Sequence, residues 1–295
     1  MSRLANAKPA VRPSLKARLM LSGPAGAGKT YSALEIAATL GERVLVIDTE
    51  KESALTYADQ FRFDHLPWRP PFDPRELAHE LVAAGETYDA IIVDSFSHFW
   101  TGSGGTLDIA DGKFGGWKTA RPAQEDVTFG GVLATPAHVI ICCRARMEYL
   151  AEEYEDKGRK RQRVTKIGLA PRQDGELEYE LNLAAEIDID HRISVSKSRT
   201  TAVPVGRSFP SGHAADLAKD YAAWLSSGEP FAEPEQVAQL AKARSELGPD
   251  AKKALWADWQ ANGLPTDLHL LTVSQATVAG ALIAQHTPNS EDGAA

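Results

Sequence analysis

Cysteine is nearly absent from this sequence. The 295 residues include two cysteines, Cys142 and Cys143, which stand side by side in an apolar run. Adjacent residues of a strand point to opposite faces of the sheet, so the two thiols cannot face the same ligand or partner. The pair therefore predicts buried thiols and excludes a disulfide framework or a cysteine metal site.

A long apolar segment is also missing. The stretch from Leu268 to Gln285 has no Asp, Glu, Lys or Arg, but Thr272 and Ser274 interrupt it, and a bilayer requires a continuous apolar segment. Near the N-terminus, Pro9 and Pro13 break up a basic stretch that no signal-peptide core follows. We therefore expect no membrane partner and a cytoplasmic protein.

Positive charge is in deficit. The chain has 40 acidic residues against 32 Lys and Arg, which gives a formal net charge of -8. Such a protein has no overall attraction to nucleic acid or anionic lipid, so contact with either requires a local basic patch. The densest patch of this kind contains Lys157, Arg159, Lys160, Arg161, Arg163 and Lys166.

The composition is otherwise that of an ordinary globular protein, with 43% hydrophobic and 24% charged residues. A chain of this length predicts about two domains. We expect a flexible arm over residues 1–15, a large α/β domain over 16–228, and a linker with a small helical module and a disordered end over 229–295. The linker is marked by two prolines and a glycine within residues 227–234.

Short apolar runs alternate with stretches of helical spacing in the first half of the chain. Strands are expected at 16–22, 43–48, 90–94 and 139–143, and helices at 29–40 and 74–84. This alternation predicts a mostly parallel sheet with helices on both faces. Ligands bind such sheets beyond the carboxyl ends of the strands.

Other segments have weaker signals. The glycine-rich residues 101–121 are expected to form a loop, and residues 148–166 a loop or a hairpin. Alternation at 187–196 predicts an edge or antiparallel strand, and 214–226 a closing helix. Helices of the C-terminal module are expected at 235–247, 249–262 and 273–285.

The strongest motif is GPAGAGKT at residues 23–30, which fits G-x-x-x-x-G-K-[ST] directly after a predicted strand and at the start of a predicted helix. Small residues let this loop curl so that its backbone amides converge on phosphate oxygens. Lys29 and the helix dipole add positive potential, and Thr30 is expected to bind Mg²⁺. The predicted nucleotide-binding residues here are Gly23, Pro24, Ala25, Gly26, Ala27, Gly28, Lys29, Thr30 and Tyr31.

Acidic residues follow two of the predicted strands. Asp94 ends the strand at 90–94, where an acid beside a phosphate loop is placed to hold the metal. Glu50 follows the strand at 43–48. If that strand lies next to the first, Glu50 can face the terminal phosphate and orient or deprotonate a water molecule. The alternative is that Asp48 and Glu50 only cap the following helix.

Seven segments, in this order, resemble the AAA-type, RecA-like ATPases of bacteriophages, including the "Sak-four" branch of single-strand annealing proteins. They are GPAGAGKTYSALEIA, VLVIDTEKESA, YDAIIVDSFSHFW, GGWKTARP, AHVIICCRARMEY, VTKIGLAPRQDGELEYEL and IDHRISVSKSR. The resemblance covers residues 16–210, and GGWKTARP and IGLAPRQDGELEYE are its more specific parts. One departure is Asn182, since relatives often have an acid at this position.

The resemblance implies a RecA-like P-loop NTPase core that hydrolyses ATP with Mg²⁺. It also implies a role in annealing or recombination during phage DNA replication. The implied partners are single-stranded DNA, further copies of the chain in a ring or filament, and a single-strand-binding protein. By this likeness Glu50 is catalytic together with Lys29, Asp94 is linked to the metal, and Arg144 reads the terminal phosphate. Lys197 and Arg199 match positions that reach the nucleotide of a neighbouring subunit.

Two segments are candidates for contact with DNA. Phe114 and Trp117 lie between Lys113 and Lys118, where aromatic rings could stack on bases and cations could contact phosphates. The other candidate residues are Arg159, Lys160, Arg161 and Arg163 of the basic patch. The alternative is that the patch neutralises the acids at 148–156 across a hairpin and that Trp117 packs in the core.

Two other functions use the same phosphate loop. A small-molecule kinase would need an acceptor pocket and an arginine-rich lid, for which the basic patch could be mistaken. A nucleotide-gated adaptor would bind nucleotide without hydrolysis and load partner proteins through the C-terminal helices. ATP turnover with and without single-stranded DNA separates these functions from a recombination ATPase.

Overall fold

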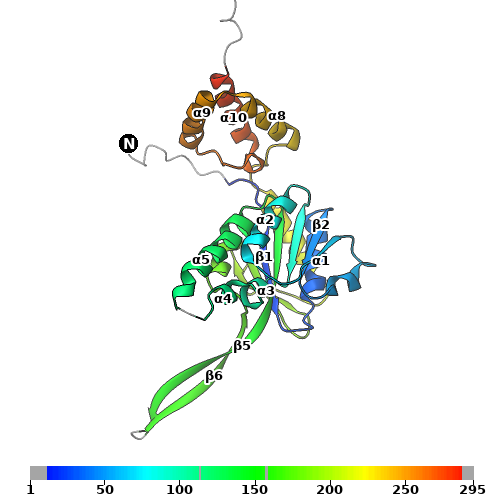
Figure 1. Cartoon of the computed structure of the whole chain (residues 1–295). Helices are drawn as coiled ribbons and strands as arrows, with labels where there is room; N and C mark the ends of the chain where they lie inside the picture. The colour runs from blue at the N-terminus through cyan, green and yellow to red at the C-terminus, as the bar shows by residue number, and fades with distance from the viewer. Residues whose placement is uncertain (1–11, 113, 157–158, 288–295) are drawn as a thin grey trace, which may run out of the picture. The chain divides into compact units, whose positions relative to one another are not determined.

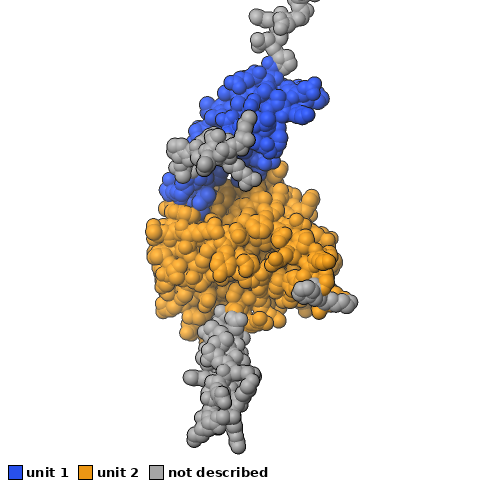
Figure 2. Space-filling model, turned by 90° about the vertical axis from the view of Figure 1, so that its left-hand side faces the viewer, with its two compact units in different colours: residues 1–15, 225–295 blue, residues 16–224 orange. Residues whose placement is uncertain are grey.

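The computed structural model describes residues 12–287 except 113 and 157–158, with Phe114 and residues 147–169 described by their backbone alone (Figure 1). The chain divides into two compact units (Figure 2). One unit is Lys16–Trp224, and the other combines Leu225–Ala295 with Met1–Leu15. Each unit has a hydrophobic core of its own, so each is described separately.

The large unit is built on a sheet with the strand order β3-β2-β4-β5-β1-β7-β8-β9, and β6 pairs with β5 outside this path. Neighbours from β3 to β7 are parallel, whereas the β7–β8, β8–β9 and β5–β6 pairs are antiparallel. This confirms the predicted α/β class with a mostly parallel sheet. The strands are β1 (Arg18–Gly23), β2 (Val44–Asp48), β3 (Asp64–Pro67), β4 (Ala90–Asp94), β5 (His138–Asp156), β6 (Arg159–Pro171), β7 (Leu183–Ile187), β8 (Ile193–Ser198) and β9 (Ser208–Phe209).

Helices of the large unit connect these strands. They are α1 (Lys29–Leu40), α2 (Pro74–Gly85), α3 (Ser97–Thr101), α4 (Thr106–Ile109), α5 (Trp117–Glu125), α6 (Leu177–Glu180) and α7 (Ala214–Ser226). Shorter or irregular turns are the 3₁₀ helices η2 (Ser53–Tyr57) and η3 (Phe114–Gly116) and the π-helix η4 (Asp126–Leu133), which continues α5. The expected helices at 29–40, 74–84 and 214–226 are therefore confirmed.

Two expectations for this unit were wrong. Residues 101–121 do not form one long loop but contain α4, η3 and the start of α5, because glycines such as Gly104 and Gly112 take positive φ at turns between short helices. Residues 187–196 do not form one strand, because a turn after Ile187 separates β7 from the antiparallel strand β8. For 148–166, the hairpin alternative is confirmed by the pairing of β5 with β6.

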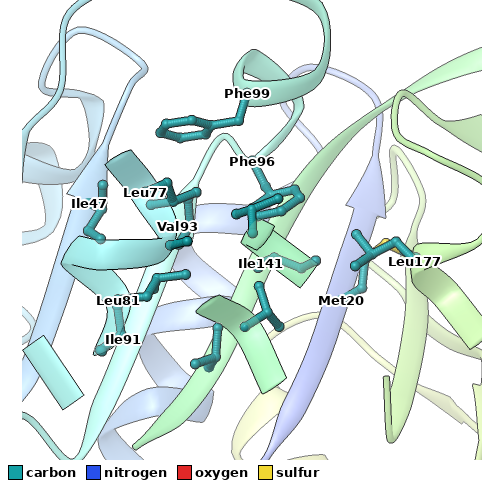
Figure 3. Close-up of a cluster of buried hydrophobic side chains, with 14 of the residues drawn as sticks. Met20, Ile47, Leu77, Leu81, Ile91, Val93, Phe96, Phe99, Ile141 and Leu177 are labelled. Atoms are coloured by element: carbon teal, nitrogen blue, oxygen red, sulfur yellow. The ribbon is translucent and has the colours of Figure 1, made fainter. Parts of the chain in front are cut away.

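The core of the large unit lies against both faces of the central strands. Every residue of β1, β2 and β4 is buried, as expected for continuous apolar strands of a parallel sheet. On one face, Ile47, Val93 and Ile141 pack with Leu77 of α2 and with Phe96 (Figure 3). On the other, α1 contacts β1, β4 and β5. This packing fixes the carboxyl ends of the strands relative to one another.

The C-terminal unit contains the predicted helices. A β-bridge joins it to a short N-terminal stretch that belongs to the same unit. Its helices are α8 (Pro234–Glu246), α9 (Pro249–Ala261), η5 (Leu268–Leu270) and α10 (Val273–His286). They enclose Trp259, Leu255, Leu271 and Ile283, and the amide of Ser14 donates to the carbonyl of Glu229 at 2.6 Å. Among the described residues of both units, no helix combines the length and apolarity needed to cross a bilayer.

Candidate nucleotide-binding site

The parallel strands bring several predicted site residues to one edge of the sheet. β1 pairs with β5, β5 with β4, and β4 with β2, so the carboxyl ends of β1, β4 and β2 meet there beside Arg144 of β5. The condition that β2 lie next to β1 is not met, because β5 and β4 lie between them. The side chain of Glu50 still lies at this edge, where Arg144 of the intervening strand β5 donates a hydrogen bond to it.

The phosphate-binding loop has the backbone that its glycines predict. Gly28 is the N-cap of α1 with φ 86°, a left-handed conformation that a residue with a Cβ adopts only at a cost. A Cβ at Gly23 would lie 2.4 Å from the carbonyl oxygen of Ile187 in β7. No side chain caps the N-terminus of α1, so its first amides and its positive dipole end are available to an anion.

Lys29, Thr30 and Asp94 come together around this loop. The Lys29 Nζ donates to the carbonyls of Gly23 at 3.1 Å and Pro24 at 2.9 Å, and Thr30 Oγ1 donates to Asp94 Oδ2. Burial raises the pKa of Asp94 to about 6, although the Thr30 hydrogen bond and the charge of Lys29 oppose this shift. A carboxylate and a hydroxyl are oxygen ligands of the kind that Mg²⁺ binds, so these residues fit the ion.

The described residues hold no group of three His, Cys, Asp or Glu side chains that could enclose a metal ion by themselves. Mg²⁺ in nucleotide sites usually keeps water ligands and binds substrate phosphates, with one or two protein carboxylates completing its shell. The pairing of Asp94 with Thr30 therefore agrees with a metal held jointly by protein, nucleotide and water.

Glu50 and Arg144 form a bidentate ion pair at the same edge. Arg144 Nε lies 2.8 Å from Glu50 Oε1, and Nη2 lies 2.6 Å from Oε2. Burial disfavours the ionised carboxylate, but hydrogen bonding and charge from Arg144, helped by His98 and Lys29, outweigh it and lower the pKa of Glu50. Glu50 is therefore ionised at neutral pH and paired with Arg144.

A family model described as an AAA domain matches residues 15–207, about two thirds of the chain. The chain belongs to this AAA-domain family. No curated protein matches it. Membership agrees with the geometry above, because an AAA domain is a nucleotide-binding ATPase domain with a P-loop at the end of a parallel strand. The family match covers nearly all of the large unit.

In this AAA domain, Asp48 rather than Glu50 orders the turn after β2. Asp48 accepts from the amide of Glu50 at 2.7 Å and from that of Ala54 at 3.1 Å, whereas the Glu50 side chain contacts Arg144. Lys51 and Glu52 follow with positive φ of 59° and 67°. A left-handed residue with a side chain costs about 1–2 kcal/mol, so the Asp48 bonds help to hold a strained turn that presents Glu50.

Thr49 and His98 belong to the site although the sequence did not indicate them. The Ser95 amide donates to Thr49 Oγ1 at 2.7 Å, and His98 Nδ1 lies 2.6 Å from the same oxygen. Burial, and then the charge of Arg144, lowers the pKa of His98, so the imidazole is neutral at pH 7. His98 lies on α3, shortly after Asp94. The one signal for it in the sequence was its place just beyond the end of a predicted strand.

A cavity of about 510 Å³ opens beside the phosphate-binding loop. Its wall includes Tyr57 and His191, which come from the η2 segment and from the turn between β7 and β8. Tyr31, predicted to contact nucleotide, lines the same cavity and packs edge-on against Tyr57 with ring centroids 5.6 Å apart. Aromatic and imidazole rings next to a phosphate site suit the base of a nucleotide.

Lys197 and Arg199 do not join the phosphate loop of their own chain. The Lys197 Nζ donates to the carbonyl of Glu178 at 2.8 Å, and Arg199 Nη2 donates to that of Tyr179. Because β8 runs antiparallel to β7, the chain at these two residues has already turned away from the loop edge. A role for them in catalysis therefore requires a second subunit.

Trp117 and Lys118 begin α5 and line a cavity of about 910 Å³. Trp117 is 42% exposed, so the alternative that it packs in the core was wrong. Its ring centroid lies 6.1 Å from that of Trp100. Lys113 and the side chain of Phe114 lie outside the described residues.

The remaining DNA-binding candidates lie on the backbone of β6. The register places Arg159 opposite Asp156, Lys160 opposite Glu155, and Arg163 opposite Glu152, whereas Arg161 is opposite Tyr154. Lys157 and the side chains of this hairpin lie outside the described residues. Opposite charges across an antiparallel pair can attract each other, so this register keeps the neutralisation alternative open.

The raised pKa of Asp94 predicts a pH-dependent stability difference. The folded protein binds this proton more tightly than the unfolded chain, so ionised Asp94 opposes folding as the pH rises through about 6. Asp94→Asn removes this cost. Urea unfolding with EDTA and without nucleotide measures the free energy of unfolding. From pH 4 to pH 8, the difference in this free energy between variant and parent should change in favour of the variant by up to about 3 kcal/mol.

Asp89→Asn is the control with the opposite sign. The hydrogen bond from Arg43 lowers the pKa of Asp89, so this variant should lose stability relative to the parent as the pH rises through the acid range. An Asp94→Asn difference that is the same at pH 4 and pH 8 would show that the Asp94 carboxyl is not desolvated in the folded protein.

Proposed function

We propose that this protein hydrolyses ATP in the presence of Mg²⁺. The observation that carries the proposal is the meeting of three groups at one sheet edge. These groups are an uncapped P-loop, the buried Asp94 hydrogen-bonded to Thr30, and Glu50 held by Arg144. A loop that only binds phosphate needs the first group, whereas hydrolysis also needs a base and a cation near the reacting phosphoryl group.

The ion pair suggests how binding and chemistry are connected. Arg144 is a bidentate donor that a terminal phosphate can engage as well as a carboxylate can. When Arg144 exchanges Glu50 for phosphate, the pKa of Glu50 rises because its main stabilising partner is lost. Glu50 then becomes a stronger base that can orient and deprotonate a water molecule.

Glu50→Gln separates binding from chemistry. The amide keeps the shape of the side chain but cannot accept the proton, so turnover should fall by at least about a hundredfold. ATP affinity should stay within about threefold of the parental value, because the phosphate-binding amides and Lys29 are unchanged. Steady-state phosphate release and calorimetric titration with Mg·ATP measure the two quantities. Parental turnover in this variant would remove Glu50 from the chemistry.

The same variant tests whether neighbouring subunits share a site. We propose that Lys197 and Arg199 stabilise charge on the nucleotide of an adjacent copy, as an arginine finger does. A mixture of Glu50→Gln with the double variant Lys197→Ala, Arg199→Ala should then recover part of the lost activity, since some interfaces combine two intact halves. Absence of recovery at every mixing ratio would contradict a shared site.

We further propose that the protein binds single-stranded DNA and assists annealing or recombination in bacteriophage DNA metabolism. The exposed ring of Trp117, with Trp100 beside it and Lys118 and Arg121 on the same cavity wall, supports this proposal. Stacking on aromatic rings together with phosphate contacts is the usual way to hold single strands without sequence preference. The acids Glu125, Asp174, Glu176 and Glu180 line the rest of the cavity, so the strand's phosphates would have to lie on the Lys118 side.

DNA affinity measured against salt tests both candidate segments. Trp117→Ala should weaken binding of an oligothymidine by about 1–3 kcal/mol with the salt slope kept, because a stacking contact is lost but no charge. Neutralising Arg159, Lys160, Arg161 and Arg163 should weaken binding and flatten the slope, because fewer counterions are released.

Trp256→Ala is the matched control, since Trp256 is 43% exposed but belongs to the C-terminal unit. It should leave the affinity for the oligothymidine unchanged. Parental affinity and slope in both the Trp117 and the four-residue variant, with each folded, would exclude these segments as the DNA site.

A further inference from the structure

The cations of residues 229–295 are concentrated in one place. From Glu229 to the end, the sequence contains nine Asp and Glu and four Lys and Arg, a net charge of -5. All four cations fall between residues 242 and 253, namely Lys242, Arg244, Lys252 and Lys253. This is the last part of α8, the connection to α9, and the first turn of α9. Within residues 229–295, the cations are therefore confined to one stretch, which also contains Glu246 and Asp250.

A groove opens at this stretch. It has a volume of about 430 Å³ and lies between α8 and α9. Leu255 and Trp259 are almost completely buried, whereas Trp256 is 43% exposed. The lining residues include two cations and no acid, and they are Ala241, Arg244, Ser245, Lys252, Leu255, Trp256 and Trp259.

The two cations are held at the walls of the groove. The Lys252 Nζ donates to the carbonyl of Ser245 at 2.8 Å, and the Arg244 guanidinium lies 6.0 Å from the centre of the Trp259 ring. Both cations therefore line the groove together with an apolar surface, of which Trp256 is the most exposed member. Tryptophan and arginine are the residue types that most often carry binding energy in protein interfaces.

We propose that this groove binds an acidic peptide segment of a partner protein through one or two large apolar side chains. The apolar side chains would fill the groove against Trp256, and flanking carboxylates would pair with Arg244 and Lys252. The number of cations in the groove favours a peptide over a nucleic acid. Two cations can release few counterions from a nucleic acid, whereas they match two carboxylates beside an apolar anchor. The groove residues belong to the C-terminal unit, whereas the nucleotide-site residues belong to the large unit, so the groove is proposed independently of ATP hydrolysis.

Fluorescence anisotropy with the full-length protein tests the proposal. The probe is a labelled synthetic peptide of about ten residues with four acidic side chains, one leucine and one phenylalanine. Lys252→Glu, Arg244→Glu and Trp256→Ala should each weaken its binding by at least about tenfold, because each removes or reverses an anchoring contact. Lys252 and Trp256 are exposed, so these two variants should fold even if the Arg244 variant does not.

Lys253→Glu is the matched control. It makes the same change of charge at the neighbouring residue, which does not line the groove, and it should weaken binding by less than about threefold. A peptide with serine in place of the leucine and phenylalanine should also bind at least about tenfold more weakly.

Three results would overturn the proposal. In the first, Lys253→Glu weakens peptide binding as much as Lys252→Glu does, or the serine peptide binds as well as the peptide with leucine and phenylalanine. In the second, an oligothymidine of equal charge binds more tightly and is lost with the same variants. In the third, the peptide does not bind and sedimentation shows self-association that Trp256→Ala abolishes, so that a second copy occupies the groove.

Discussion

The hydrogen bond from Thr30 to the buried carboxylate of Asp94 joins the phosphate-binding loop to the central sheet. Thr30 lies at the start of α1, and Asp94 ends β4, which is separated from β1 by β5. The contact therefore spans the strand between them and fixes the loop relative to the acid that would share a metal with it. A buried carboxylate at this position costs stability, and the raised pKa of Asp94 is the sign of that cost.

The other acid of the site is held in a different way. Glu50 stands after a turn with two left-handed residues, and both of its oxygens contact Arg144. The amide bonds to Asp48 help to maintain the turn, so Glu50 is presented by a hydrogen-bonded turn and paired with the side chain of Arg144. A carboxylate whose pKa is lowered by such a pair is a weaker base than a free one.

Much of the site could be predicted because its signals are local. The motif at 23–30 and the acid at the end of 90–94 each depend on a few neighbouring residues, and the structure brings them together. Strand order is not local. Nothing in the spacing of β2 shows that β4 and β5 separate it from β1, and the contact of Glu50 with Arg144 depends on that order. His98 and His191 were missed for the same reason, since both join the site through the packing of distant elements.

Short helices between glycines were also beyond prediction. Residues 101–121 contain so many glycines that the helical turns of α4 and η3 carry no periodic signal, although their packing buries Thr106 and Ala110. The consequence is that Trp117 lies at a helix start beside a cavity rather than in a long loop. Its exposure, which excludes core packing, required the tertiary structure.

Calorimetric titration of the parent and of Lys29→Ala with Mg·ATP is the most direct test of the nucleotide site. The parent should bind ATP, and the variant should lose at least about tenfold in affinity, because the lysine charge and the loop amides hold the phosphates together. Its fold should persist, since Lys29 is half-buried and its Nζ donates to two carbonyls of the same loop, those of Gly23 and Pro24. Equal affinity in a folded variant would contradict the assignment of this loop as the phosphate-binding site.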